Sequence, residues 1–114
     1  MGNYMEKAAD SFLTKNNIIY EVTKSLGTKI ESIYIIGSFL NDGWNQQFSD
    51  IDLVCIDSSF ENFPYLVNQK YIKNKLSYLS FRFDINIFTH EQFYREMKIN
   101  PKFNKEINKG IRLW

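Results

Sequence analysis

Residues 79–88 read LSFRFDINIF, and this stretch constrains the fold more than any other part of the chain. Leu79, Phe81 and the apolar residues at 83, 85 and 87 alternate with a second set that includes Arg82 and Asp84. Alternation of this kind indicates a β-strand, because successive side chains of an extended chain point to opposite faces of a sheet. We therefore predict a strand over 79–88, with an apolar face and a face that carries Arg82 and Asp84.

Two shorter apolar runs predict further strands. Ile33–Ile36 ends at Gly37, and Ile51–Ile56 follows a polar loop, so both read as buried strands. The last residues, IRLW at 111–114, predict a short closing strand.

Helices are predicted between these strands. Apolar residues recur at helical spacing over 4–26, and Gly27 stands where a glycine would cap the helix. The residues of this apolar face are Met5, Ala8, Ala9, Phe12, Ile19, Val22 and Leu26. Pro64 opens a second predicted helix at its first position, running to about Lys75. A third predicted helix starts at His90, after a Thr89–Gln92 capping box, and ends before Pro101. A fourth, short helix is predicted around Phe103 and Ile107 and stops at Gly110. The expected fold is a small α/β (α+β) domain, with helices packed on a mixed sheet.

Length and composition narrow the class of protein. A chain of 114 residues suits a single domain, so we expect one unit over 1–114 with an N-terminal helix at 4–26 and a core at 30–114. The net charge of +1 does not favour extensive nucleic-acid binding. A single cysteine, Cys55, excludes an internal disulfide and is expected to be buried. Neither a signal peptide nor a membrane span is evident, so we expect a cytoplasmic protein.

The acidic residues are the chemically informative ones. Asp50 and Asp52 lie at i and i+2 of a strand, so they share a face, about 7 Å apart. Asp84 lies on the polar face of the later strand, and the three carboxylates converge if the two strands are neighbours. Like charges brought together call for a cation, and an oxygen-only site suits Mg²⁺ or Mn²⁺. Such a triad can hold two ions for in-line displacement at phosphorus. The alternative is a solvated strand face.

Gly37 and Ser38 favour the first interpretation. A glycine directly after a strand permits positive φ or close backbone approach. A helix beginning there would direct free N–H groups, together with the serine hydroxyl, toward a phosphate.

The combined pattern of these residues resembles the nucleotidyltransferase superfamily that includes DNA polymerase beta. The pattern consists of Gly37-Ser38, then Ser49-Asp50-Ile51-Asp52-Leu53, then Asp84. The ending Gly110-Ile111-Arg112-Leu113-Trp114 is similar to that of its small members, the minimal nucleotidyltransferase (MNT) domain proteins. One departure is Asp42, which stands where many relatives carry glycine, with Gly43 following.

The resemblance implies an enzyme that moves a nucleoside monophosphate from a nucleoside triphosphate to a hydroxyl acceptor and releases pyrophosphate. AMP from ATP is the expected group. Asp50, Asp52 and Asp84 would bind Mg²⁺ (or Mn²⁺), and Asp84 could also act as the base. Gly37 and Ser38 would hold the phosphates.

The resemblance also implies a partner: a helical protein of the HEPN type, or a second copy in a homodimer. Two alternatives to catalysis as the main role follow. The protein would be an antitoxin of a toxin–antitoxin pair that binds or adenylylates its partner, or a nucleotide-binding relative without turnover.

Two other residues leave alternatives open. Trp44 stacks on a base or packs its loop against the domain. Arg82 pairs with a carboxylate or with a phosphate. His90, the only histidine, reads as a surface residue at a helix start.

Overall fold

The computed structural model describes the backbone of residues 4–114 and the side chains of residues 14–114. Its helices are α1 (Tyr4–Leu26), α2 (Tyr65–Lys75), α3 (His90–Ile99) and α4 (Pro101–Lys109), with single 3₁₀ turns η1 (Gly37–Leu40) and η2 (Ser58–Asn62). Its strands are β1 (Ser32–Ile36), β2 (Ile51–Ile56), β3 (Phe83–Phe88) and β4 (Ile111–Arg112).

The strands form one mixed sheet in the order β3-β2-β1-β4. β1 pairs antiparallel with both β2 and β4, whereas β2 and β3 are parallel. The predicted small mixed sheet with helices packed on it is therefore confirmed. The parallel β2–β3 pair matters most for function, because it aligns the two strands that carry the aspartates.

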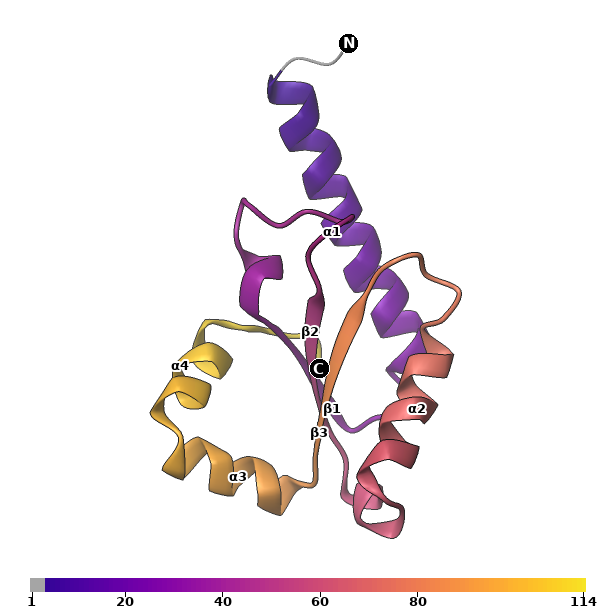
Figure 1. Cartoon of the computed structure of the whole chain (residues 1–114), viewed down its shortest axis with the longest axis vertical. Coiled ribbons are helices and arrows are strands. Elements are labelled where there is room, and N and C mark those ends of the chain that lie inside the picture. The colour runs from indigo at the N-terminus through magenta and orange to yellow at the C-terminus, as the bar shows by residue number, and fades with distance from the viewer. Residues whose placement is uncertain (1–3) are drawn as a thin grey trace.

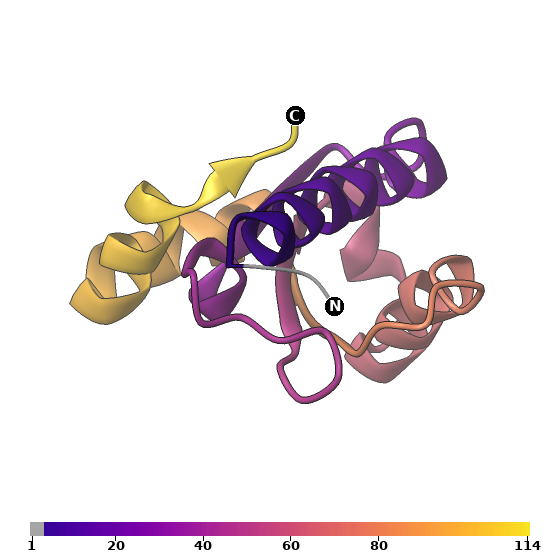
Figure 2. The same ribbon diagram turned by 90° about the horizontal axis from the view of Figure 1, so that it is seen from above.

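Both faces of the sheet are covered by helices (Figures 1 and 2), with α1 and α2 on one face and α3 and α4 on the other. Under α1 and α2 lies the larger core, where Ile18, Val22 and Leu26 meet Leu53 and Ile85. Under α3 and α4, a smaller core joins Val54, Ile56, Phe93 and Ile107. In the alternation along the strands, Asp52 and Asp84 belong to the same face of the sheet as this smaller core. They lie at the strand ends that the apolar residues of this core do not fill.

Helix boundaries agree with the local signals. The range of α1 matches its apolar spacing, but the side chains of Met5, Ala8, Ala9 and Phe12 lie outside the described ones. The Thr89–Gln92 capping box is present at the start of α3. Pro64 is the residue before α2 rather than its first residue. Gly27 follows α1 without the positive φ of a left-handed cap, and a Cβ there would stand 2.6 Å from the Thr23 carbonyl oxygen.

The prediction of a strand over 79–88 is wrong in its first part. β3 begins at Phe83, which pairs with Ile51, the first residue of β2. Residues 79–82 have no neighbouring strand there, and a β-strand requires a hydrogen-bonded neighbour. Their apolar members, Leu79 and Phe81, still pack on the larger core. The alternation therefore predicted which side chains face inward, but not where the ladder stops.

At the opposite end of the sheet, polar contacts connect Glu31, the residue before β1, to the segments that follow β2 and β3. Glu31 accepts hydrogen bonds from the Ser58 backbone and hydroxyl, and its other oxygen lies 2.7 Å from His90 Nε2. The Ser58 bonds, followed by His90, lower the pKa of Glu31 to about 2. His90 is thus the partly exposed first residue of α3, with a structural contact.

Cys55 is buried, as expected, and burial raises the pKa of its thiol to about 12. Over the described part of the chain, no helix combines the length and the apolar character that crossing a bilayer requires.

Candidate active site

The parallel register places Asp52 directly beside Asp84. Asp50 immediately precedes β2, so all three predicted aspartates lie at the same end of neighbouring strands. Because side chains opposite each other in a sheet are close neighbours, the fold meets the main requirement of the predicted site. It brings together residues that are 32 positions apart in the sequence.

We call the strand end that carries Asp50, Asp52 and Asp84 the acidic corner. The pKa of Asp52 in this corner is raised from its ordinary value of 3.8 to about 6. Burial is the largest cause, followed by the negative charges of Asp84, Asp50 and Glu106 and by a hydrogen bond with Asp84. Crowded carboxylates raise each other's pKa in this way unless a cation compensates them. The corner is therefore a region of strong negative potential.

Glu106 is the acidic residue that sequence reasoning missed. It lies on α4, whose apolar residue Ile107 packs into the smaller core. The apolar spacing of Phe103 and Ile107 indicated which face of the helix is buried. It could not indicate that the neighbouring glutamate lies close enough to Asp52 to raise its pKa, because that depends on where α4 crosses the sheet.

Arg82 pairs with a carboxylate in this structure. Its Nε lies 3.2 Å from Asp50 Oδ1, and its Nη2 donates to the Phe48 carbonyl oxygen. Both charged side chains are more than half exposed, at 63 % and 54 %. An exposed ion pair of this kind contributes at most about 1 kcal/mol. The pair is consequently weak enough for a ligand to displace.

The oxygen-only donor set of Asp50, Asp52 and Asp84 fits a hard divalent cation such as Mg²⁺. Within residues 14–114, however, no group of three or more His, Cys, Asp or Glu side chains is arranged as a metal centre. We attribute the absence of such a group to Asp50, because its carboxylate is paired with Arg82. Asp52 and Asp84 are adjacent and fit as ligands, and Asp50 would join them by exchanging its arginine partner for the cation.

Gly37 supports the Asp52 side chain through close contact. It follows β1 with φ +80°, and Ile36 before it pairs with Asp52. A Cβ on Gly37 would stand 2.4 Å from Asp52 Oδ2, so only glycine leaves room for this carboxylate. Ser38 is exposed next to it, at the start of η1, and Phe39 anchors that turn in the core. The strand–glycine–serine arrangement predicted from sequence therefore lies against Asp52.

The loop between η1 and β2 is folded onto the domain by Trp44. This side chain is only 7 % exposed, and its ring meets Phe39 edge-on at 5.1 Å and Phe81 at 6.4 Å between centroids. The burial favours the packing alternative for Trp44 over stacking on a base. Its indole Nε1 is buried without a hydrogen-bond partner among the described residues.

Lys15 of α1 fastens the same loop. Its Nζ donates to the Asn41 carbonyl oxygen at 2.9 Å and lies 5.5 Å and 5.9 Å from the ring centroids of Phe39 and Trp44. The Lys15 ammonium group thus contacts the end of η1 and the two aromatic rings that pack the loop. α1 thereby helps to hold the segment between Ser38 and Asp50.

We expect Lys15→Met to loosen this loop and to lower the free energy of unfolding by about 1–2 kcal/mol, the sum of one hydrogen bond and a cation–π contact. With Trp114→Phe as background, Trp44 is the remaining tryptophan, and acrylamide should quench its fluorescence more strongly in the variant. Lys24→Met, on an exposed position of α1, is the matched control. Equal quenching in the two variants would contradict the role of Lys15.

Asp52→Asn should stabilise the protein in metal-free buffer. A raised native pKa means that the folded state binds more protons between pH 3.8 and about 6, so stability falls as the pH rises through that window. The penalty is complete above pH 6. The shift corresponds to nearly 3 kcal/mol, which solvent screening reduces to about 1–2 kcal/mol.

Urea unfolding in the presence of EDTA tests this prediction. The gain over the unmodified protein should appear at pH 7.5 and disappear near pH 4, whereas Asp42→Asn, in the exposed loop, should change little at either pH. A gain that persists unchanged at pH 4 would mean that repulsion among the carboxylates is not its source.

Comparison with known proteins agrees with this geometry. A family model described as "Nucleotidyltransferase domain" matches residues 17–110, a range that contains Gly37, Ser38 and all three aspartates. No curated protein matches the chain at a significant level. The match covers most of the chain and includes β1, β2 and β3, the last part of α1, all of α2, α3 and α4, and the acidic corner. The chain therefore belongs to the nucleotidyltransferase domain family.

Proposed function

We propose that the protein is a metal-dependent nucleotidyltransferase that moves the nucleoside monophosphate of a triphosphate, with ATP as the expected donor, to a hydroxyl acceptor. The observation that carries the proposal is the register of Asp52 beside Asp84, with Gly37 against the Asp52 carboxylate. Family membership supports nucleotidyl transfer in general, and the acidic corner supports its dependence on a divalent metal.

The proposed roles follow from charge and position. Asp50, Asp52 and Asp84 would hold the metal ions, which when bound neutralise the phosphates and polarise the reacting phosphorus. Ser38 is exposed beside Gly37, and its hydroxyl would donate to a phosphate oxygen. Arg82, released from Asp50, would supply a further positive charge.

In the proposed reaction the acceptor oxygen forms a bond to the α-phosphorus while the bond from that phosphorus to the pyrophosphate oxygen breaks. The proton of the acceptor hydroxyl passes to the Asp84 carboxylate. Asp84 is the most suitable base because it is exposed at the strand end, whereas Asp52 is half-buried beneath Gly37. The leaving pyrophosphate carries negative charge, which a divalent cation held by Asp50, Asp52 and Asp84 would compensate.

Transfer of label from triphosphates distinguishes this reaction from its alternatives. The protein, Mg²⁺ and a cell lysate or the product of the adjacent gene would be incubated with each of the four α-labelled triphosphates. Label should reach an acceptor from α-labelled but not from γ-labelled ATP, and EDTA should abolish it. Transfer from γ-labelled ATP would indicate a kinase, and nucleotide binding without any transfer would indicate a non-catalytic relative.

The identity of the acceptor stays a prediction from the resemblance, as does the choice between a HEPN-type partner and a homodimer. The same labelling experiment addresses it. A labelled protein band that requires the neighbouring gene product would favour the antitoxin role.

A further inference from the structure

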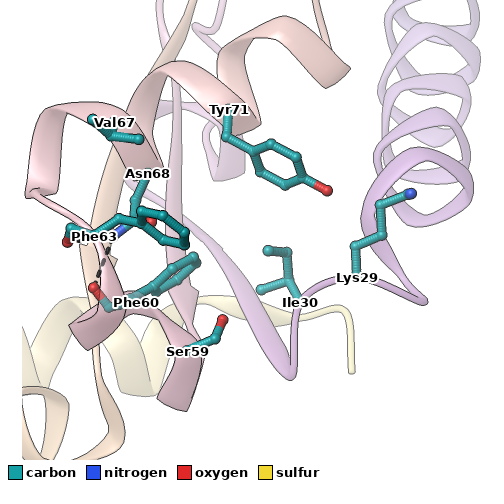
Figure 3. Close-up of a pocket in the computed structure, with 8 residues that line it drawn as sticks. All are labelled: Lys29, Ile30, Ser59, Phe60, Phe63, Val67, Asn68 and Tyr71. Atoms are coloured by element: carbon teal, nitrogen blue, oxygen red, sulfur yellow. Dashed lines mark hydrogen bonds between the residues drawn. The ribbon is translucent and has the colours of Figure 1, made fainter.

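A second concave site lies at the end of the sheet remote from the aspartates. This pocket has a volume of about 380 Å³ and is formed by α2, η2 and the segment before β1 (Figure 3). Ile30 precedes β1 and Phe60 follows β2, so the pocket lies beyond the strand ends opposite to Gly37 and Asp52. Its volume falls in the range of small-molecule sites, about 300–1,000 Å³.

The walls of the pocket are mainly apolar and aromatic. Ile30 and Phe60 are buried parts of the core, while Phe63, Val67 and Tyr71 form the outer wall and are 60 %, 51 % and 45 % exposed. The core of the domain leaves these three apolar side chains largely uncovered. Burying their surface against a ligand would be favourable by about 25 cal/mol per Å².

The pocket is held in shape by Asn68. This α2 side chain is 93 % buried, and its Nδ2 donates to the carbonyl oxygens of Phe60 at 2.8 Å and Phe63 at 3.2 Å. These bonds fix the η2 segment against α2, as Figure 3 shows for the Phe60 contact. A wall that is already in place lowers the conformational cost of binding.

Lys29 brings a positive charge to the lining of the pocket. Figure 3 shows the Tyr71 ring extending from α2 toward Lys29, with its hydroxyl at the leading end. Lys29 forms no ion pair with any residue in the described part of the chain. The sequence of α2 contains three lysines and no acid, and Lys75 Nζ lies 5.5 Å from the centroid of the Tyr71 ring.

Neither carboxylate that lies next to the pocket, Glu31 or Asp57, forms an ion pair with Lys29. Glu31 is bonded to Ser58 and His90, and Asp57 accepts from the backbone N–H and hydroxyl of Ser59. Lys29 and the Tyr71 hydroxyl are therefore free to meet an anionic group.

We propose that this pocket binds a small aromatic carboxylate. The aromatic ring would lie between Phe60, Phe63 and Val67, and the carboxylate would pair with Lys29 and accept a hydrogen bond from the Tyr71 hydroxyl. An aromatic side chain in an acidic peptide shares this chemistry. The small ligand is favoured because a hollow of this size matches one ring with a short acidic tail, whereas a stable protein interface buries well over about 1,000 Å².

Three probes that differ in charge or in the presence of a ring test the proposal by amide chemical-shift titration of the ¹⁵N-labelled protein. 4-Phenylbutyrate should shift the amides of Lys29, Phe63 and Tyr71. 4-Phenylbutylamine, with the opposite charge, and butyrate, without a ring, should each bind at least tenfold more weakly. Lys29→Met should weaken phenylbutyrate about tenfold, whereas the exposed Lys24→Met on α1 should leave its affinity unchanged.

Val67→Trp gives an independent test, because its larger side chain should fill the hollow and remove phenylbutyrate binding. The spectra of the free variants report whether each is folded, and Lys29→Met changes only an exposed charge, so the test does not depend on the tryptophan variant folding. Equal affinity for the acid and the amine, no binding of either, or binding of an acidic aromatic peptide alone would each overturn the proposal. Nucleotidyl transfer is not needed for any of these measurements.

Discussion

Asp52→Asn is expected to reduce nucleotidyl transfer by about 10³-fold or more while the protein remains folded. The substitution keeps the shape of the side chain but removes the negative charge that lies between Gly37 and Asp84. A carboxamide binds a hard cation far more weakly than a carboxylate does, so the charge on the reacting phosphate would be left uncompensated. The rate of acceptor labelling from α-labelled ATP at saturating Mg²⁺ measures the loss.

Asp42→Asn is the matched control, because Asp42 is an exposed acid in the loop that precedes β2. It should transfer nucleotide at nearly the unmodified rate. The combination of lost activity and increased stability in metal-free buffer would identify Asp52 as a residue retained for function at a cost to folding. Labelling that survives Asp52→Asn would rule out the proposed metal site.

Gly37→Ala should have the largest effect on the fold of the site. The added methyl group meets Asp52 Oδ2 at 2.4 Å, and the backbone has φ +80°, which residues with a side chain rarely adopt. Strain in the left-handed region and overlap with the carboxylate together predict a loss of about 2–4 kcal/mol in the free energy of unfolding. Displacement of the Asp52 carboxylate should also reduce nucleotidyl transfer by about 10²-fold.

A double-mutant cycle separates the two causes. In an Asp52→Ala background the overlap disappears but the backbone strain remains, so Gly37→Ala should cost at least about 1 kcal/mol less than in the unmodified protein. Gly43→Ala serves as the control, since a Cβ there has no atom within 4 Å and the backbone φ is not positive. It should change stability by less than about 1 kcal/mol. An equal cost of Gly37→Ala in both backgrounds would show that the contact with Asp52 is unimportant.

These predictions concern a corner where the protein tolerates unfavourable electrostatics. Asp52 is half-buried next to other negative charges, and the only cation paired with them among the described residues is Arg82, through an exposed contact with Asp50. A site of this kind gains most from a divalent cation, which would relieve the repulsion among the carboxylates. The pocket near Lys29 is mainly apolar and lies at the opposite end of the sheet.

Much of the local structure was predictable from the sequence because it depends on neighbouring residues. The Thr89–Gln92 capping box, the apolar spacing up to Leu26 and the runs at Ile33–Ile36 and Ile51–Ile56 each specify an element through contacts within a few residues. The error at 79–82 shows the limit of such signals. The length of a strand is set by its neighbour, and β2 begins only at Ile51.

The sequence by itself determined which residues are candidates for the proposed chemistry: the Gly37-Ser38 turn and the aspartates at 50, 52 and 84 were identifiable by residue type and spacing. The tertiary structure alone decided how they are arranged. Four of these arrangements join segments that are distant in the sequence. They are the parallel register of β2 and β3, the pairing of Asp50 with Arg82, the proximity of Glu106 to Asp52 and the contact of Lys15 with the loop. Such contacts depend on how the layers pack, and no local pattern of side chains encodes that packing.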